Sequence, residues 1–214
     1  MRVLKADDFS GKKARDVVRI LERGGVICFP TDTSYGLGVD AANESAVERL
    51  FEVKGRPESR PILLLVSSIG MALAVSRPTP DFEAAASRFW PGPITLVVHA
   101  GRTLSGRVTA GTGTVGLRWP RMPLALELVE LLGRPLTATS ANRSNRPVVG
   151  SVSEAIEQLG EGVDVYVDAG PLRGSPVSTV LDLTKNPPVL LREGPVSREE
   201  LTEFFGEVMG RSSD

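Results

Sequence analysis

The apolar positions of the chain fall in short blocks whose spacing predicts interleaved strands and helices. Residues 26–29 form an apolar run typical of a buried strand, and Pro30 ends it because proline has no N–H for a strand ladder. Residues 31–38 follow as a loop dense in hydroxyl groups and glycine. Apolar residues then recur at helical spacing after Asn43, a good helix cap, up to the stop signals at residues 55–57.

The remaining blocks continue this mixture. Further strands are expected over residues 62–66, 94–98, 114–117, 136–139, 163–167, 177–183 and 189–191. Further helices are expected between Ser10 and Gly24, from Thr79 to Trp90, over residues 124–132, and after the capping boxes Ser151/Glu154 and Ser197/Glu200. Residues 163–167 alternate with acidic positions, as an edge or half-exposed strand would, and residues 101–113 are expected to be a mobile loop. Elements that interleave without strict alternation predict an α/β (α+β) fold with a sheet of mixed direction covered by helices.

Length and composition indicate one sizeable core, because the chain has 214 residues of which 41% are hydrophobic. We therefore expect a single domain over residues 1–209 and a frayed tail over residues 210–214. No apolar run approaches the roughly 20 residues of a membrane span. The first ten residues are too polar for a signal peptide, so no membrane association and a cytoplasmic location are expected.

Charge and reactive residues exclude several classes of function. The formal net charge of −1 does not indicate a nucleic-acid binder. The one cysteine, Cys28, lies in an apolar run and is expected to be a core thiol, which leaves no disulfide framework. With His99 as the one histidine, neither a His/Cys metal site nor a histidine-based triad is expected.

Polar and basic residues cluster at the ends of predicted strands, where open sheets bind ligands. The clusters are Thr31 to Tyr35 with Lys54 and Arg56, Thr114 with Arg118, Ser140 with Asn142, and Arg192 alone. Cations without an evident nucleophile suit chemistry in which a triphosphate is bound and charge at phosphorus is stabilised. Mg²⁺ would then be held mainly by the phosphates and water, with Asp32 as the nearest protein carboxylate. Arg121, Arg143 and Arg146 are equally well explained as ordinary surface arginines.

Six motifs in order resemble those of the YrdC-like family over about residues 10–195. They are PTDTSYGLG (30–38), KGRP (54–57), FWPGPIT (89–95), GLRWP (116–120), TSANRS (139–144) and STVLD (178–182). The resemblance implies a twisted α/β sheet around a concave, positively charged cavity. It also implies a nucleotidyltransferase that makes threonylcarbamoyl-AMP and pyrophosphate from L-threonine, bicarbonate and ATP. Partner proteins would then pass the threonylcarbamoyl group to tRNA.

The same resemblance implies roles for individual residues. The catalytic group around the nucleotide would be Lys54, Arg56, Ser140 and Asn142. Further ATP contacts would come from Arg60, Thr114, Val148 and Arg192, with Arg56 also on the nucleotide. The pocket for L-threonine would be formed by Thr33, Tyr35, Arg118, Ala138 and Ser178, with Arg118 pairing the carboxylate.

The chain departs from the family pattern at four positions. The family often has histidine at Leu65, asparagine at Arg60, histidine at Met122 and proline at Glu193. Leu65 bears on the amino-acid substrate, because the family residue touches the threonine. Two alternatives therefore stay open: a module that binds structured RNA through the basic cavity, and a paralogue with an altered carbamoyl or amino-acid substrate. The extra C-terminal domain of longer relatives is not expected.

Overall fold

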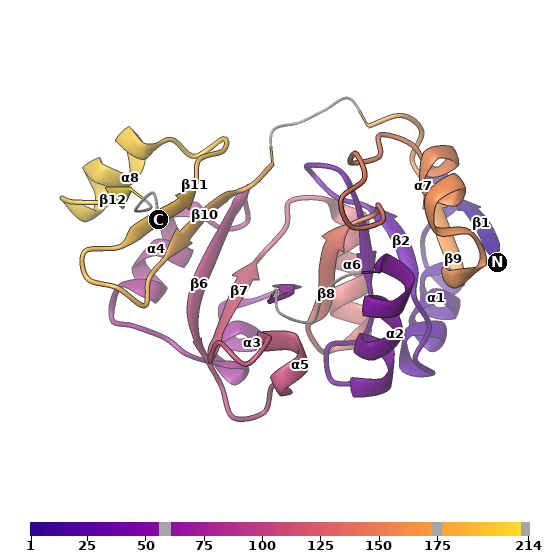
Figure 1. Cartoon of the computed structure of the whole chain (residues 1–214), viewed down its shortest axis with the longest axis horizontal. Helices are drawn as coiled ribbons and strands as arrows, with labels where there is room; N and C mark the ends of the chain where they lie inside the picture. Colours follow the sequence, from indigo (N-terminus) through magenta and orange to yellow (C-terminus); the bar gives the residue numbers. More distant parts are fainter. Residues whose placement is uncertain (56–60, 173–176, 211–214) are drawn as a thin grey trace.

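The strands of the computed structural model lie side by side in one mixed sheet (Figure 1). The structure describes residues 1–55, 61–172 and 177–210. Within these residues the strand order is β1-β9-β2-β3-β8-β4-β7-β6-β10-β11-β12, with β5 paired to β6. The strands are β1 (Arg2–Lys5), β2 (Ile27–Pro30), β3 (Tyr35–Gly38), β4 (Leu63–Leu65), β5 (Ser76–Arg77), β6 (Ile94–Ala100), β7 (Thr114–Arg118), β8 (Leu136–Ser140), β9 (Val165–Asp168), β10 (Thr179–Asp182), β11 (Val189–Arg192) and β12 (Met209–Gly210).

Helices cover both faces of this sheet. They are α1 (Lys12–Glu22), α2 (Glu44–Lys54), α3 (Ile69–Ala74), α4 (Asp81–Phe89), α5 (Gly106–Thr109), α6 (Pro123–Leu132), α7 (Val152–Leu159) and α8 (Arg198–Phe205), with 3₁₀ turns η1 (Ala6–Asp8) and η2 (Gly160–Gly162). The apolar faces of α1 and α6 pack in one core with side chains of β2, β4, β8 and β9. Side chains of α2, α4, α7 and α8 belong to a second, larger core with the opposite side chains of the strands. The expected mixed sheet with helical cover is confirmed.

Helix ends follow the sequence signals closely. The Asn43 side chain accepts a hydrogen bond from the Ala46 amide at 3.1 Å, and Gly55 ends α2 with φ +57°. Ser151 and Ser197 cap α7 and α8 as expected. Ser10 does not cap α1, because Gly11 occupies the N-cap position and no side chain caps it.

Several predicted loops and edges are wrong in detail. Residues 35–38, expected in a loop, form the buried strand β3, which is hydrogen-bonded to β2 and β8. Gly38 permits this position, because a Cβ atom there would lie 2.7 Å from the Thr137 carbonyl oxygen. Strand β9 is neither an edge nor half-exposed, because it pairs with both β1 and β2 and its residues 165–167 are buried. The loop 101–113 contains α5, and Gly210, expected in the tail, ends β12 beside β11.

The short strand β4 lies in the middle of the sheet. It has three residues, whereas its neighbours β8 and β7 have five each. Leu63 and Leu65 point to one face of β4, since side chains alternate along a strand.

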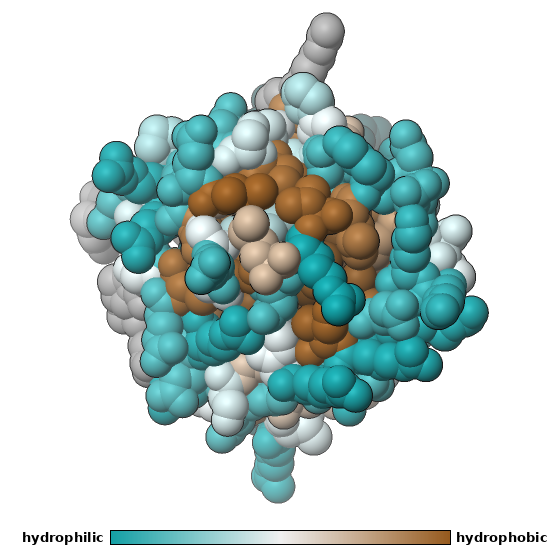
Figure 2. Space-filling model, turned by 90° about the vertical axis from the view of Figure 1, so that its right-hand side faces the viewer, coloured by the Kyte–Doolittle hydropathy of each residue, from teal (hydrophilic) through white to brown (hydrophobic). Residues whose placement is uncertain are grey.

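On the side of the molecule toward β1 and α7, hydrophobic residues gather at the centre and hydrophilic side chains surround them (Figure 2).

Candidate active site

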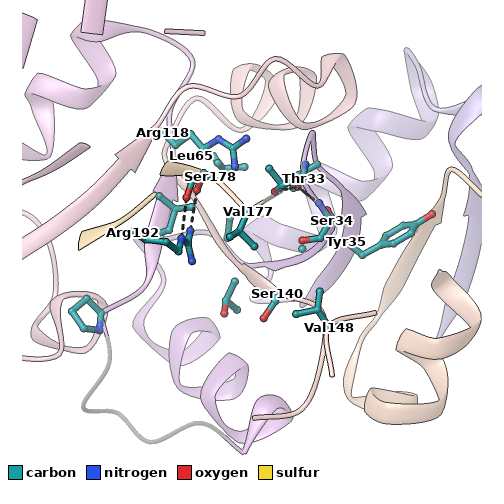
Figure 3. Close-up of a pocket in the computed structure, with 16 residues that line it drawn as sticks. Thr33, Ser34, Tyr35, Leu65, Arg118, Ser140, Val148, Val177, Ser178 and Arg192 are labelled. Carbon is teal, nitrogen blue, oxygen red and sulfur yellow. Dashed lines mark hydrogen bonds between the residues drawn. The ribbon is translucent and has the colours of Figure 1, made fainter. Parts of the chain in front are cut away.

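A cavity of about 330 Å³ lies over β4, between the two halves of the sheet (Figure 3). One wall is the β2–β3 turn with the end of β8, and the facing wall is the end of β7 with the residues just before β10 and the end of β11. Its lining residues are Thr31, Thr33, Ser34, Tyr35, Gly36, Pro61, Leu63, Leu65, Arg118, Ala138, Thr139, Ser140, Val148, Val177, Ser178 and Arg192. The structure therefore brings together residues that lie up to 161 positions apart in the sequence, from Thr31 to Arg192 (192 − 31).

The β2–β3 turn is held by the side chain of Thr31. Its hydroxyl donates to the Ser34 carbonyl oxygen at 2.7 Å and accepts from the Thr33 and Ser34 amides at 3.3 and 3.2 Å. This hydroxyl organises the turn, so Thr33 and Ser34 are left to face the cavity. Thr31 thus both shapes the turn and lines the site, and Thr33 and Ser34 line the site beside it.

Arg118 closes one end of the cavity from the last position of β7. Its Nε donates to the Gly92 carbonyl oxygen at 3.2 Å, and its Nη2 forms an ion pair with Oδ2 of Asp32. Burial lowers the pKa of the guanidinium, and the charge of Asp32 and its hydrogen bond oppose that shift. The group stays charged at neutral pH, because an arginine pKa is far above 7.

Arg192 enters the same cavity from the last position of β11. It donates from Nε to the Ser178 carbonyl oxygen at 2.9 Å and from Nη2 to the Ser178 hydroxyl at 3.2 Å, the contacts dashed in Figure 3. Burial first, and then the positive charge of Arg118, lower the pKa of Arg192. Two arginines whose positive charges interact within one cavity form a site for an anion.

Neutral side chains complete the site. Ser140 ends β8, and Ala138 lies two residues earlier on the same side of that strand. Val148 and Val177 line the mouth and are 56% and 45% exposed. The cavity thus combines a basic wall, a wall of hydroxyls and an apolar rim.

Five predicted residues depart from the expected geometry or lie outside the described structure. Lys54 is 3% exposed and does not line the cavity, since its ammonium group bonds the carbonyl oxygens of Ser140 and Asn142. Asn142 also lies behind the lining, where its Nδ2 donates to the carbonyl oxygens of Arg143 and Arg146. Thr114 begins β7, at the opposite end from Arg118. Arg56 and Arg60 lie outside the described residues.

Tyr35 lines the cavity, but its ring runs away from it (Figure 3). The hydroxyl donates to the Gly170 carbonyl oxygen at 2.7 Å and accepts from the Ala169 amide at 2.9 Å. Tyr35 thus helps to wall the pocket as expected, while its hydroxyl is bonded to the backbone of residues 169 and 170. The side chain is buried because alternate residues of β3 face opposite sides of the sheet.

Other lining residues were missed by sequence reasoning. Pro61 and Leu63 belong to the apolar floor, and the alternation of β4 with Leu65 could have indicated Leu63. Val177 precedes Ser178, so the serine motif pointed to its neighbourhood without singling it out. The pairing of Asp32 with Arg118 had no sequence signal, because the two residues are far apart in the chain.

The described part of the chain contains neither a metal-binding cluster nor a membrane-spanning helix. Within residues 1–55, 61–172 and 177–210, no three His, Cys, Asp or Glu side chains gather as a metal site would require. In the same part of the chain, no helix has the length and apolar character needed to cross a bilayer.

Comparisons with known proteins identify relatives of most of the chain. The Sua5/YciO/YrdC family model, described as "Telomere recombination", matches residues 19–194. The threonylcarbamoyl-AMP synthase of Pyrococcus abyssi is 39% identical over 197 residues, covering 92% of this chain and 58% of the relative. A putative threonylcarbamoyl-AMP synthase of Mycobacterium tuberculosis is 40% identical over 190 residues, covering 88% and 87%.

Solved structures give the same result. P. abyssi Sua5 in complex with L-threonine superposes with a TM-score of 0.91 at 36% identity, covering 98% of this chain and 62% of that one. Escherichia coli YciO superposes with a TM-score of 0.82 at 26% identity, covering 95% and 98%. The chain spans 58% and 55% of the relatives from P. abyssi and Bacillus subtilis. On this sequence and fold evidence, the chain belongs to the Sua5/YciO/YrdC family.

Proposed function

We propose that the protein is a nucleotidyltransferase that joins L-threonine, bicarbonate and ATP into threonylcarbamoyl-AMP and pyrophosphate. The observation that carries the proposal is the meeting of Arg118 and Arg192 in one cavity with a wall of hydroxyls. Relatives at 37–40% identity are named threonylcarbamoyl-AMP synthases, and the P. abyssi structure contains L-threonine.

The amino acid is assigned to the end of the cavity beside Arg118. A carboxylate is a good partner for a guanidinium, and Arg118 keeps N–H groups beyond those used by Gly92 and Asp32. Thr33 and Ser178 supply hydroxyls for the polar atoms of the substrate, and Ala138 with Leu65 supplies an apolar surface for its methyl group.

The nucleotide is assigned to the side of Arg192, Ser140 and Val148. Of the two described arginines that line the cavity, Arg192 is the one left for phosphate oxygens, because Arg118 is assigned to the amino acid. The exposed Val148 offers an apolar surface to the base. Arg56 and Arg60 are assigned to the phosphates on their sequence motif. Lys54 and Asn142 are assigned a supporting role, because they hold the loop behind Ser140. Thr114 is assigned to the nucleotide on its sequence motif alone.

The proposed chemistry needs no covalent bond to the protein. The threonine amine and bicarbonate form a carbamate with loss of water. A carbamate oxygen then attacks the α-phosphorus, the bond to the bridging oxygen of the β-phosphate breaks, and pyrophosphate leaves with the electron pair. Arg192 would stabilise negative charge on the phosphates as this happens.

Mg²⁺ fits this site as an ion carried by the nucleotide. The cavity presents hydroxyls and guanidinium groups, and Asp32, the carboxylate beside it, is already paired with Arg118. Mg²⁺ keeps several waters and binds readily to substrate phosphates, where it neutralises charge. By the same proposal the product passes to tRNA through downstream threonylcarbamoyl-transferase proteins, in the cytoplasm.

The test is pyrophosphate release by the purified protein with Mg²⁺. We expect release that requires ATP, L-threonine and bicarbonate together, with background rates when any one is left out. Arg118→Gln should lower the rate at subsaturating threonine by at least about tenfold, the loss expected for one charge-assisted contact. A folded wild-type protein that releases no pyrophosphate with all three substrates would falsify the proposal.

A further inference from the structure

Asp32 and Arg118 form an ion pair at the edge of the cavity. Their side chains are 18% and 4% exposed, so the guanidinium is buried and the carboxylate is mostly buried. Asp32 lies in the β2–β3 turn, and Arg118 lies on β7, on the other side of β4. The pair therefore joins the two halves of the sheet across the site.

The hydrogen bonds of Arg118 leave one edge of its guanidinium group available. Nε donates to the Gly92 carbonyl oxygen, and Nη2 forms the ion pair with Asp32. The Gly92 amide donates in turn to the Trp119 carbonyl oxygen at 2.9 Å, which anchors that acceptor beside the arginine. Contacts on two different nitrogens fix the plane of the guanidinium, and Arg118 lines the cavity.

We propose that Asp32 is a positioning residue for the amino acid: its carboxylate orients Arg118 so that the free N–H groups meet the carboxylate of the substrate. This role rests on the proposed function, which places the amino acid beside Arg118. Asp32 itself touches no substrate atom in this arrangement. Its effect on binding passes through the guanidinium.

Two observations favour this role over one in folding alone. The β2–β3 turn is already held by the Thr31 hydroxyl, so Asp32 is not required for its shape. Oδ1 of Asp32 is buried and has no hydrogen-bond partner among the described residues. A carboxylate kept only for stability would be expected to have both oxygens satisfied when buried.

The test is calorimetric titration of the whole protein with L-threonine, and separately with ATP and Mg²⁺. Asp32→Asn keeps the shape and a hydrogen-bond acceptor, Asp32→Glu keeps the charge but moves it, and Asp32→Ala removes both. For threonine we expect the Kd to rise less than about threefold, about fivefold and more than about tenfold, in that order. The Kd for ATP should stay within about twofold in all three.

A double variant isolates the route of the effect. In an Arg118→Gln background, Asp32→Ala should change the threonine Kd less than about twofold, because the group it orients is gone. The control is Asp40→Asn, which breaks the ion pair of a buried carboxylate with the exposed Arg134 at 2.8 Å, away from the cavity. It should leave both Kd values unchanged. If Asp32→Ala does not fold, the comparison of Asp32→Asn with Asp32→Glu carries the test.

Three results would overturn the inference. They are an unchanged threonine Kd in Asp32→Ala, equal losses for threonine and ATP, and a Glu variant that binds threonine better than the Asn variant. The last result would mean that charge, and not orientation, is what Asp32 supplies. A wild-type protein that binds no threonine overturns the proposed function and this role with it.

Discussion

The ammonium group of Lys54 donates a 2.8 Å hydrogen bond to the carbonyl oxygen of Asn142, 88 residues further along the chain. A second hydrogen bond goes from the same group to the Ser140 carbonyl oxygen. The last residue of α2 thus holds the loop that leaves β8. The motifs KGRP (54–57) and TSANRS (139–144) look like two parts of one anion site. The hydrogen bonds of Lys54 that join them stabilise the fold instead. Among the described residues of these two motifs, Thr139 and Ser140 line the cavity, and Lys54 does not.

Lys54→Met should lower stability as well as activity. The change removes two charge-assisted hydrogen bonds and leaves two carbonyl oxygens without that donor, so we expect a loss of about 3 kcal/mol in the free energy of unfolding. Urea titration followed by circular dichroism measures it. Lys13→Met, which breaks an exposed pair with Asp8, should cost less than about 1 kcal/mol. Equal stability of the two variants would contradict a supporting role for Lys54.

Arg192→Gln should weaken ATP binding and leave the fold unchanged. Arg192 is exposed on the cavity wall, and its loss removes a guanidinium from the proposed phosphate subsite. We expect the KM for ATP to rise at least about tenfold, which corresponds to about 1.4 kcal/mol. Pyrophosphate release at varied ATP measures this. Arg19→Gln, on the exposed face of α1, is the control and should behave as wild type. An effect on threonine alone would move Arg192 out of the nucleotide subsite.

Leu65→His should sharpen the choice of amino acid. Leu65 is buried in the cavity floor and offers no hydrogen bond to a substrate hydroxyl. Valine differs from threonine by a methyl group in place of that hydroxyl, and an apolar pocket separates such pairs by only about 10- to 200-fold. We expect histidine to raise the threonine-to-valine ratio of kcat/KM by about tenfold. A ratio that does not move would show that position 65 does not meet the side chain of the substrate.

Stability should fall in alkaline solution because of Cys28. Burial raises the pKa of its thiol from 9.0 to about 12. Between these values the unfolded chain loses the proton while the folded chain keeps it, so unfolding becomes more favourable as pH rises, by up to about 1.4 kcal/mol per pH unit. Burial also raises the pKa of Tyr35, which acts in the same direction. Cys28→Ala should show a shallower fall between pH 9 and 10.5 in urea titrations, and identical slopes would refute this account.

Ser151→Ala and Ser10→Ala form a matched pair of helix-cap variants. The Ser151 hydroxyl accepts from the Glu154 amide at 3.3 Å, and Glu154 bonds back to the Gly150 amide at 2.8 Å. Loss of this cap should cost about 1 kcal/mol. Ser10→Ala should be within about 0.5 kcal/mol of wild type, since Ser10 caps no helix. Thermal melts of both variants measure this difference. Equal shifts in melting temperature would contradict the expected difference between the two helix starts.

Local signals along the chain determined most of the elements. Asn43, Ser151 and Ser197 cap the helices that the sequence places after them, because a cap acts through amides only two or three residues away. The apolar run at residues 26–29 became β2 for a similar reason, since burial of a strand depends on its own side chains. Motif order was also sufficient to indicate the family.

Strand pairing and side-chain direction were decided only by the tertiary structure. Strand β3 exists because β2 and β8 supply its hydrogen bonds, and no residue of 35–38 carries that information. The site follows the same rule. Arg118 and Arg192 meet because β7 and β11 end at one cavity, whereas Lys54 is drawn to the carbonyl oxygens behind it. A charged residue in a sequence specifies a donor, but the partners that surround it in space determine what it binds.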